Sequence, residues 1–147
     1  MTFQTAKVEE TPETIAPDGS RVRPLCTLPE RASFARFELA PEQVSQAVSH
    51  ATVEEIWYVI GGAGRIWRAM ADREEVTDLV PGVCLTLPIR TTFQFRAGPE
   101  GLLVVAATVP PWPNTPDEAR VGRGTWPSGR ARRKPGTPPD SRRAHVG

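Results

Sequence analysis

One stretch of the chain, from Val48 to Trp67, constrains the fold more than any other. Its side chains alternate, so Glu55, Trp57 and Val59 share one face of an extended chain and the residues between them share the other. Glycines follow at positions 61, 62 and 64, and glycine readily adopts the positive dihedrals of a tight hairpin turn. The pattern predicts a strand over 55–60, a turn, and a returning strand over 65–70.

The rest of the chain consists of similar short extended runs, each bounded by turn-forming residues. Turn signals stand at Pro29-Glu30, Pro41-Glu42, Gly61-Gly62, Asp72-Arg73, Pro81-Gly82 and Gly98-Pro99. Strands are predicted between them, at residues 21–27, 33–39, 44–50, 55–60, 65–70, 75–80, 83–87, 92–96 and 102–108. No segment of useful length has helical periodicity. The nearly regular strand spacing predicts an all-β sandwich or barrel.

The spacing of His50, Glu55 and Gly62 resembles the second half of the first cupin signature, G-x5-H-x-H-x3,4-E-x6-G. Val48 stands at the first His position of that signature, and Glu42 stands at its opening Gly. The resemblance extends over residues 22–109. It implies a double-stranded β-helix of the jelly-roll type, which is a barrel that encloses one pocket.

The second cupin signature, G-x5-P-x-G-x2-H-x3-N, is matched only at its start. Gly82 and Pro88 have the required spacing, whereas Arg90, Phe93 and Ala97 occupy its Gly, His and Asn positions. The scaffold residues of the signatures therefore match better than the residues that carry chemistry.

The resemblance implies a metal site, because cupins bind one divalent metal ion at the positions held here by Val48, His50, Glu55 and Phe93. Imidazole and carboxylate ligands suit Fe, Mn, Ni or Zn and leave positions open for a substrate. Only His50 and Glu55 keep such ligands, and a catalytic metal ordinarily has about three protein ligands. Gln46, which shares a strand face with His50 by alternation, is the best candidate for a third.

Two other interpretations of His50 and Glu55 stay open at this point. They form either a hydrogen-bonded buried pair or an acid–base pair that works without metal. Trp57 and Phe93 supply aromatic walls typical of small-molecule pockets. Arg90, in place of the cupin glycine at a pocket-side turn, is a candidate contact to an anion.

Composition divides the chain into three segments. Residues 1–19 are polar and interrupted by prolines, which predicts a flexible N-terminal segment, and residues 20–113 form the barrel domain. Residues 114–147 are rich in Pro, Gly and Arg and have too little apolar surface to offset the entropy of ordering. We expect this tail to be disordered and its removal to leave the stability of the barrel nearly unchanged.

Charge is distributed unevenly along the chain. Residues 1–112 hold 10 Lys and Arg against 14 Asp and Glu, whereas residues 113–147 hold 8 against 3. No nucleic-acid recognition motif accompanies the basic tail, so nucleic acid is not an expected partner. The chain has no secretory signal and no apolar run of about 18 residues, which favours a cytoplasmic protein without a membrane partner.

Three functional hypotheses follow from the sequence. The first is a cupin barrel that binds a small organic molecule, with His50, Glu55 and Gln46 as its polar contacts. The second is a metal-dependent enzyme of the isomerase or dioxygenase type, as the resemblance implies. The third is a non-catalytic structural or interaction barrel. A homodimer formed by the folded body is also predicted, because strand edges of a small barrel are exposed to self-pairing and because the cupins that the chain resembles commonly dimerise.

Overall fold

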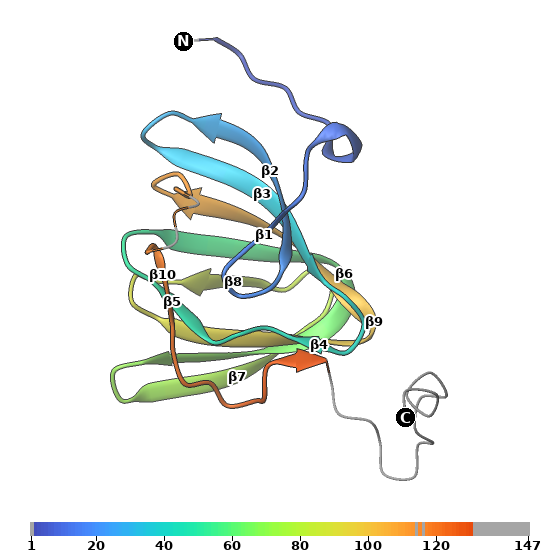
Figure 1. Ribbon diagram of the computed structural model, residues 1–147, viewed down its shortest axis with the longest axis vertical. Coiled ribbons are helices and arrows are strands. Elements are labelled where there is room, and N and C mark those ends of the chain that lie inside the picture. Colours follow the sequence, from blue (N-terminus) through green and yellow to red (C-terminus); the bar gives the residue numbers. More distant parts are fainter. Residues whose placement is uncertain (1, 114, 116, 131–147) are drawn as a thin grey trace, which may run out of the picture.

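The computed structural model describes residues 2–113, 115 and 117–130, and these form an almost entirely β structure (Figure 1). Apart from one 3-10 turn, η1 (Val8–Glu10), the elements are strands. They are β1 (Thr14–Ile15), β2 (Arg21–Leu28), β3 (Ala32–Leu39), β4 (Gln43–Val44), β5 (Val48–His50), β6 (Glu54–Met70), β7 (Arg73–Leu79), β8 (Cys84–Leu87), β9 (Thr92–Val109), β10 (Ala119–Val121) and β11 (Gly129–Arg130). No helix in this part of the chain is long and apolar enough to cross a membrane.

Strands β6 and β9 are the central pair of the barrel. They have 17 and 18 residues and pair antiparallel from Glu54 opposite Val109 to Ala69 opposite Thr92. The first half of β6 also pairs with β8, and its second half pairs with β7. The first half of β9 pairs with β4 and β5, and its second half pairs with β3. Both long strands therefore pass from one layer of the barrel into the other, which confirms the predicted all-β, jelly-roll fold.

The predicted hairpin at the glycines is wrong, because β6 continues through them. The pairing of β6 with β9 shifts between Val59 and Gly61 and again between Gly62 and Gly64, as at β-bulges. A Cβ on Gly62 would clash with the carbonyl oxygen of Gly101, and one on Gly64 with that of Arg96. These glycines bend the strand and let two backbones approach closely. The predicted break at Gly98-Pro99 is likewise absent, since β9 runs through it.

The inner faces of the two layers meet in an apolar core. Trp57 is fully buried, and its ring lies edge-on against Phe37 and Phe95, with centroid distances of 4.7 and 4.9 Å. Val59 is buried beside it, whereas Ile56, Tyr58 and Ile60 are exposed on the outer face. The alternation predicted for residues 55–60 is therefore confirmed.

The N-terminal segment contacts the barrel, in contrast to the flexible lead-in expected for residues 1–19. β1 pairs with β2, and the guanidinium of Arg23 donates a hydrogen bond to the carbonyl of Thr11 (2.6 Å). The carboxylate of Asp18 accepts a hydrogen bond from the N–H of Ser20 (2.8 Å). These contacts fix Asp18 at the end of the barrel where β2 begins.

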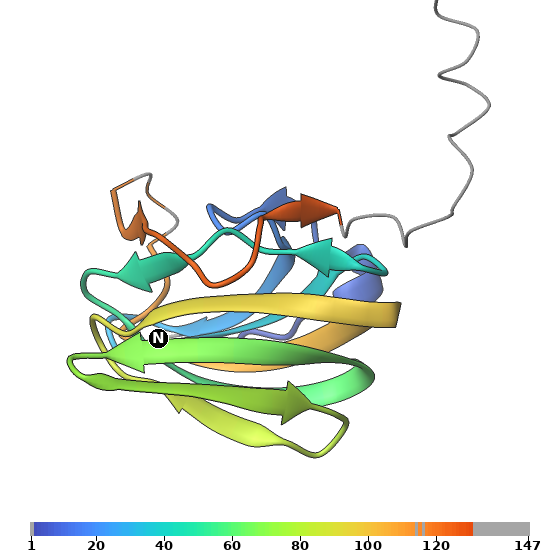
Figure 2. The ribbon, with the colours of Figure 1, turned by 90° about the horizontal axis from the view of Figure 1, so that it is seen from below.

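The chain after β9 also lies on the barrel, as far as it is described. β10 pairs with β5 and β11 pairs with β4, and Figure 2 shows this segment running beside those strands, in orange to red. The expected disorder is therefore wrong for residues 117–130, which we call the C-terminal strap; residues 131–147 lie outside the described part of the chain. Composition misled here because backbone pairing and polar side chains, rather than apolar area, hold the strap.

Candidate functional site

His50 and Glu55 face each other at the junction of β5 and β6. His50 ends β5, and the short connection over residues 51–53 returns the chain so that Glu55, the second residue of β6, lies beside it. Glu55 Oε1 is 3.8 Å from His50 Nε2, and both side chains are 12% exposed. Glu55 Oε2 accepts a hydrogen bond from the indole N–H of Trp57 (2.9 Å). The structure thus brings together the pair that the sequence predicted.

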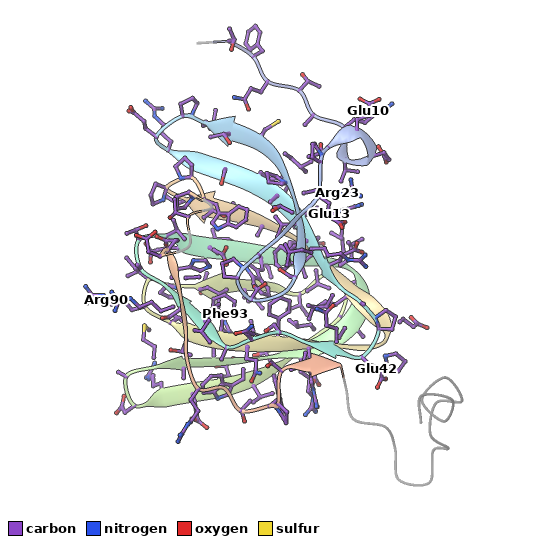
Figure 3. The ribbon with its side chains drawn as sticks, in the orientation of Figure 1. Glu10, Glu13, Arg23, Glu42, Arg90 and Phe93 are labelled. Carbon is purple, nitrogen blue, oxygen red and sulfur yellow. The ribbon has the colours of Figure 1, made fainter. Side chains whose placement is uncertain are left out.

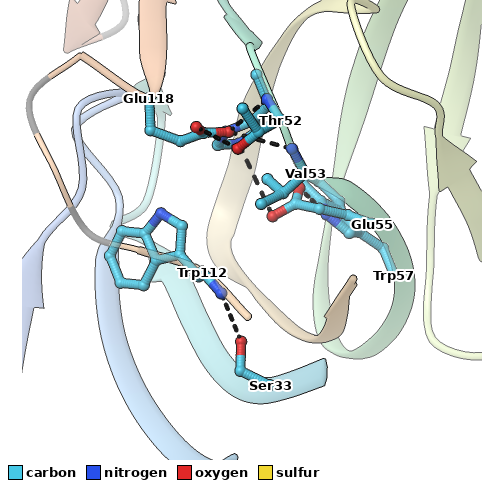
Figure 4. A network of polar contacts seen from close by, with 8 residues as sticks. Ser33, Thr52, Val53, Glu55, Trp57, Trp112 and Glu118 are labelled. Atoms are coloured by element: carbon cyan, nitrogen blue, oxygen red, sulfur yellow. Dashed lines mark hydrogen bonds and ion pairs between the residues drawn. The ribbon is translucent and has the colours of Figure 1, made fainter. Parts of the chain in front are cut away.

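A third ionisable residue, Glu118, reaches the same imidazole from the C-terminal strap. Its Oε1 lies 3.7 Å from His50 Nδ1. The carboxylate accepts hydrogen bonds from the N–H groups of Thr52 (3.0 Å) and Val53 (3.2 Å) and from the Thr52 hydroxyl (2.7 Å), as Figure 4 shows. Sequence reasoning missed Glu118 because it lies in the tail expected to be disordered. The available signal was the short alternation of residues 118–121 before Gly122.

A cavity inside the barrel adjoins His50 and Glu55. Its apolar walls include Val22, Phe37, Val48, Trp57, Ala106 and Trp112, and its polar lining consists of Asp18, Ser20, His50, Glu55 and Thr108. Among the residues that the structure describes, no Lys or Arg lines it. The space that the centre of a water molecule can reach is about 50 Å³, whereas about 520 Å³ lies between the lining atoms when the open mouth is included. The cavity therefore has little room for a ligand beyond the solvent-open space at its mouth.

The three carboxyl groups near His50 have different electrostatic surroundings. Burial raises the pKa of Glu55, against the opposing effects of His50 and the Trp57 N–H. Burial also raises the pKa of Asp18, although the hydrogen bonds of Ser20 oppose it. Burial acts in the same direction on Glu118, but the hydrogen bonds from Thr52 and Val53 together outweigh it and lower the pKa. A carboxylate that stays ionised and a carboxyl that readily holds a proton therefore flank one imidazole.

The remaining predicted site residues are not all at the cavity. Trp57 lines it, and Phe93 lies behind it, where its ring stacks on that of His50 at a centroid distance of 5.8 Å. Gln46, expected to reach inward, is exposed, because residues 45–47 leave the strand conformation and the alternation counted back from His50 fails there. Arg90 is also exposed and projects away from the barrel, unlike Phe93 (Figure 3). Its backbone N–H, not its side chain, contacts the site by donating to the His50 carbonyl (3.2 Å).

The four positions that the resemblance assigns to a metal come together, but their side chains do not fit one. Val48 pairs with Phe93 across β5 and β9, and Phe93 stacks on His50, so apolar groups replace two ligands. Among the residues that the structure describes, no three His, Cys, Asp or Glu side chains are grouped to hold a metal ion. Two ligands fall short of the three that a catalytic metal site ordinarily keeps.

The two-layered barrel, with its pocket inside and its bulged central strands, is a cupin fold. Three solved structures that resemble it have this fold. A variant of Streptomyces PAC13 with uridine has a TM-score of 0.66 and 18% identity, and the match covers 84% of this chain and 93% of that one. PAC13 is described as a nucleoside dehydratase.

The other two resemble the barrel to a similar degree. KdgF from Halomonas sp. has a TM-score of 0.63 and 18% identity, with 74% of this chain and 94% of that one covered. A Bacillus subtilis oxalate decarboxylase variant has a TM-score of 0.63 and 16% identity, with 74% and 30% covered. No protein-family model matches the sequence, and no curated protein is significantly similar to it. At these identities the likeness concerns the fold.

Proposed function

We propose that the barrel binds a small uncharged or cationic organic molecule, and that His50 and Glu55 exchange a proton with it without a metal ion. One observation carries this proposal: the His50 imidazole lies between Glu55, whose pKa is raised, and Glu118, whose pKa is lowered, beside an aromatic-lined cavity. Ionisable groups with shifted pKa values in a cavity are typical of functional sites.

The charge of the lining supports this class of ligand. Asp18 and Glu55 are acidic, and no Lys or Arg from the described part of the chain lines the cavity. One structural neighbour is an oxalate decarboxylase. An anion such as oxalate would lose its hydration in this cavity without gaining a counter-charge. Hydroxyl, amide and amidinium groups, by contrast, can donate hydrogen bonds to carboxyl oxygens. The uridine bound to PAC13 is a neutral molecule of this favoured class.

The size of the cavity limits what reaches the ionisable groups. A single water needs about 10–15 Å³ of the space open to its centre, and the cavity offers about 50 Å³. Only a small end of the ligand therefore fits beside His50 and Glu55. The rest of the ligand contacts the other lining residues, of which Phe37 and Trp112 offer aromatic rings.

A purely structural pair accounts less well for the geometry. Two buried groups that exist to satisfy each other are joined by a hydrogen bond, but His50 and Glu55 are 3.8 Å apart. His50 Nδ1 is buried and has no hydrogen-bond partner among the described residues. Distances of this length are common in active sites without ligand and shorten when the ligand binds. The pair is therefore better suited to proton transfer than to holding the fold.

Three probes of nearly equal shape test the proposed ligand class: acetate, acetamide and acetamidinium, which carry charges of −1, 0 and +1. At equal ionic strength and neutral pH, acetamide and acetamidinium should raise the melting temperature and shift the amide NMR signals of residues around the cavity, because they bind the folded state. Acetate should do neither. Stabilisation by acetate equal to that by acetamide would overturn the proposed selectivity.

Variants then locate the binding. The acidic side chains of Asp18 and Glu55 should favour acetamidinium over acetamide, and the double variant D18N/E55Q, which removes both acidic groups, should abolish this preference. Asp72 stands at an exposed turn between β6 and β7, so D72N is the matched control and should leave the preference unchanged. An unchanged preference in the double variant would show that the probes bind elsewhere.

We also propose a homodimer formed by the outer face of the sheet of β3, the second half of β9 and the first half of β6. The exposed apolar side chains Phe34, Ile56, Tyr58 and Ile60 lie on this face, and Phe34 and Ile56 share one row across β3, β9 and β6. A large exposed apolar patch is typical of protein–protein contact. Light scattering at micromolar concentration should give a dimeric mass for the wild type and a monomeric mass for Y58E, and a monomeric wild type would refute the dimer.

A further inference from the structure

The C-terminal strap (residues 117–130) lies along the chain segment that carries His50. Near the cavity β10 pairs with β5, which places Ala119 opposite His50. Further along, the N–H of Gly122 donates to the carbonyl of Ala47 (2.8 Å), and β11 then pairs with β4. The strap is therefore attached to the barrel at both of its ends and between them.

Gln94 fixes the middle of the strap. It alternates with the inward-facing Phe93 and Phe95 on β9, yet it is fully buried. Its Nε2 donates to the carbonyls of Trp126 (2.7 Å) and Ser45 (3.0 Å), and its Oε1 accepts the N–H of Trp126 (2.8 Å). This exchange of two hydrogen bonds with one backbone residue resembles strand pairing and holds the strap in one position.

Glu118 is the residue through which the strap meets the site. Its side chain is 5% exposed, and its backbone carbonyl accepts the N–H of Ala51 (2.9 Å). Three donors from Thr52 and Val53 hold its carboxylate. The carboxylate oxygen nearest to His50 lies 3.7 Å from Nδ1, which is buried and has no hydrogen-bond partner within residues 2–113, 115 and 117–130. Since buried polar atoms are nearly always hydrogen-bonded, the two groups form an incomplete contact.

We propose that Glu118 is a positioning residue, which keeps the proton of the neutral His50 imidazole on Nδ1 and leaves the lone pair of Nε2 for Glu55 and the ligand. An ionised carboxylate only accepts hydrogen bonds, so it favours the tautomer with a proton on the nitrogen that faces it. The strap thereby becomes part of the site. The inference rests on the proposed function only in that the Nε2 lone pair then accepts a proton from Glu55 or the ligand.

The resulting proton path is balanced and needs no further reactant. A proton leaves the carboxyl of Glu55, or a donor group of the ligand, and bonds to the Nε2 lone pair. The imidazole becomes an imidazolium beside the Glu118 carboxylate, which stabilises its positive charge. Return of the Nε2 proton to the ligand or to Glu55 restores the starting state, while the Nδ1 proton stays in place throughout.

The tautomer of His50 can be read directly in the free protein. His145 is the other histidine of the chain, so H145Q leaves His50 as the single histidine. Long-range proton–nitrogen NMR spectra of this ¹⁵N-labelled full-length protein, at mildly alkaline pH, report which ring nitrogen is protonated. We expect one tautomer, protonated on Nδ1, and a shift toward protonation on Nε2 in E118Q and E118A.

Matched variants separate positioning from mere support of the fold. T52V removes one hydrogen bond to Glu118 but keeps the carboxylate, so it should lower stability without changing the tautomer. A Cβ on Gly124 would clash with the Gln94 amide and lie 2.8 Å from Ala47 Cβ, whereas one on Gly122 would meet only Thr92 at 3.8 Å. G124A should therefore displace the strap and change the tautomer in the direction of E118A, and G122A should not.

The outcomes are distinct from those of the ligand tests. An Nε2-protonated His50 in the wild type, or a tautomer unchanged in folded E118Q, overturns the positioning role even when the acetamide series binds as expected. The expected tautomer shift supports the role even when no probe binds. Where E118A does not fold, E118Q and G124A decide between the two results.

Discussion

His50 stands between two walls that are held by different forces. The β6 wall, which carries Glu55, pairs with β9 along its whole length and anchors Trp57 among Phe37, Phe93 and Phe95. The strap wall, which carries Glu118, has short strands and is held by backbone pairing and the amide of Gln94. Apolar area is visible in the composition of a segment, whereas hydrogen bonds to distant residues are not. Both walls place a carboxyl group near His50, but only the β6 wall could be predicted from the composition of its segment.

The largest effect should follow from removing the buried aromatic side chain of the β6 wall. Trp57→Ala removes a fully buried ring and the N–H that donates to Glu55, and such changes cost about 3–5 kcal/mol of unfolding free energy. Val76→Ala, at an exposed position of the neighbouring strand β7 and outside the proposed dimer face, is the control and should cost about 0.5 kcal/mol or less. Urea denaturation measures both. Equal losses would show that Trp57 does not anchor this wall.

Removing the strap should have the next largest effect. Truncation after Pro113 removes the partners of Thr52, Val53 and Gln94, and we expect a loss of about 2–4 kcal/mol because several buried polar groups lose their hydrogen bonds. Truncation after Arg130 keeps every described contact of the strap and is the matched control. A loss below about 0.5 kcal/mol in the shorter chain would support the disordered tail that composition alone predicts.

The fold was predictable because its signals are local. Alternation over 55–60 and the turn residues between strands follow from short-range geometry, and the spacing of His50 and Glu55 brings neighbours in sequence together. The glycines at 61–64 were misread because a hairpin and a bulged, continuous strand require the same residue type. Only the pairing with β9 distinguishes the two.

The site was predictable only in part, for a different reason. Asp18 and Glu118 come from segments 32 residues before and 68 residues after His50, and both segments were expected to be flexible. Their positions depend on backbone pairing with β2 and β5. Gln46 failed as an inward contact because a strand period cannot be counted across residues that leave the strand.

The two walls should also respond to pH in opposite directions. The pKa of Glu118 is lower in the folded protein than in the unfolded chain, so its stabilising contribution is present above the unfolded value of about 4.3 and is lost as pH falls through the folded value. The pKa of Glu55 is raised, so its contribution is present below the unfolded value and is lost as pH rises through the folded value.

Isosteric variants convert this difference into a measurement. E118Q should lower the unfolding free energy at neutral pH by an amount that shrinks as the pH falls toward 3, whereas E55Q should raise it at neutral pH and have little effect near pH 3. Denaturation curves at both pH values give the comparison. A stabilising E118Q, or a destabilising E55Q, at neutral pH would contradict the assignment of which carboxyl group stays ionised beside His50.

The smallest effect should come from the one aromatic contact of the strap. The guanidinium carbon of Arg96 lies 4.7 Å from the centroid of the Trp126 ring, and a cation–π contact of this kind contributes about 0.5–1 kcal/mol at an exposed site. Arg96→Gln should therefore cost no more than that amount. A double-mutant cycle with Trp126→Leu isolates the coupling between the two side chains, and a coupling near zero would mean that the strap depends here on Gln94 alone. Because Gln94 bonds the backbone of Trp126 and not its ring, Arg96→Gln should leave the strap in place and the tautomer of His50 unchanged.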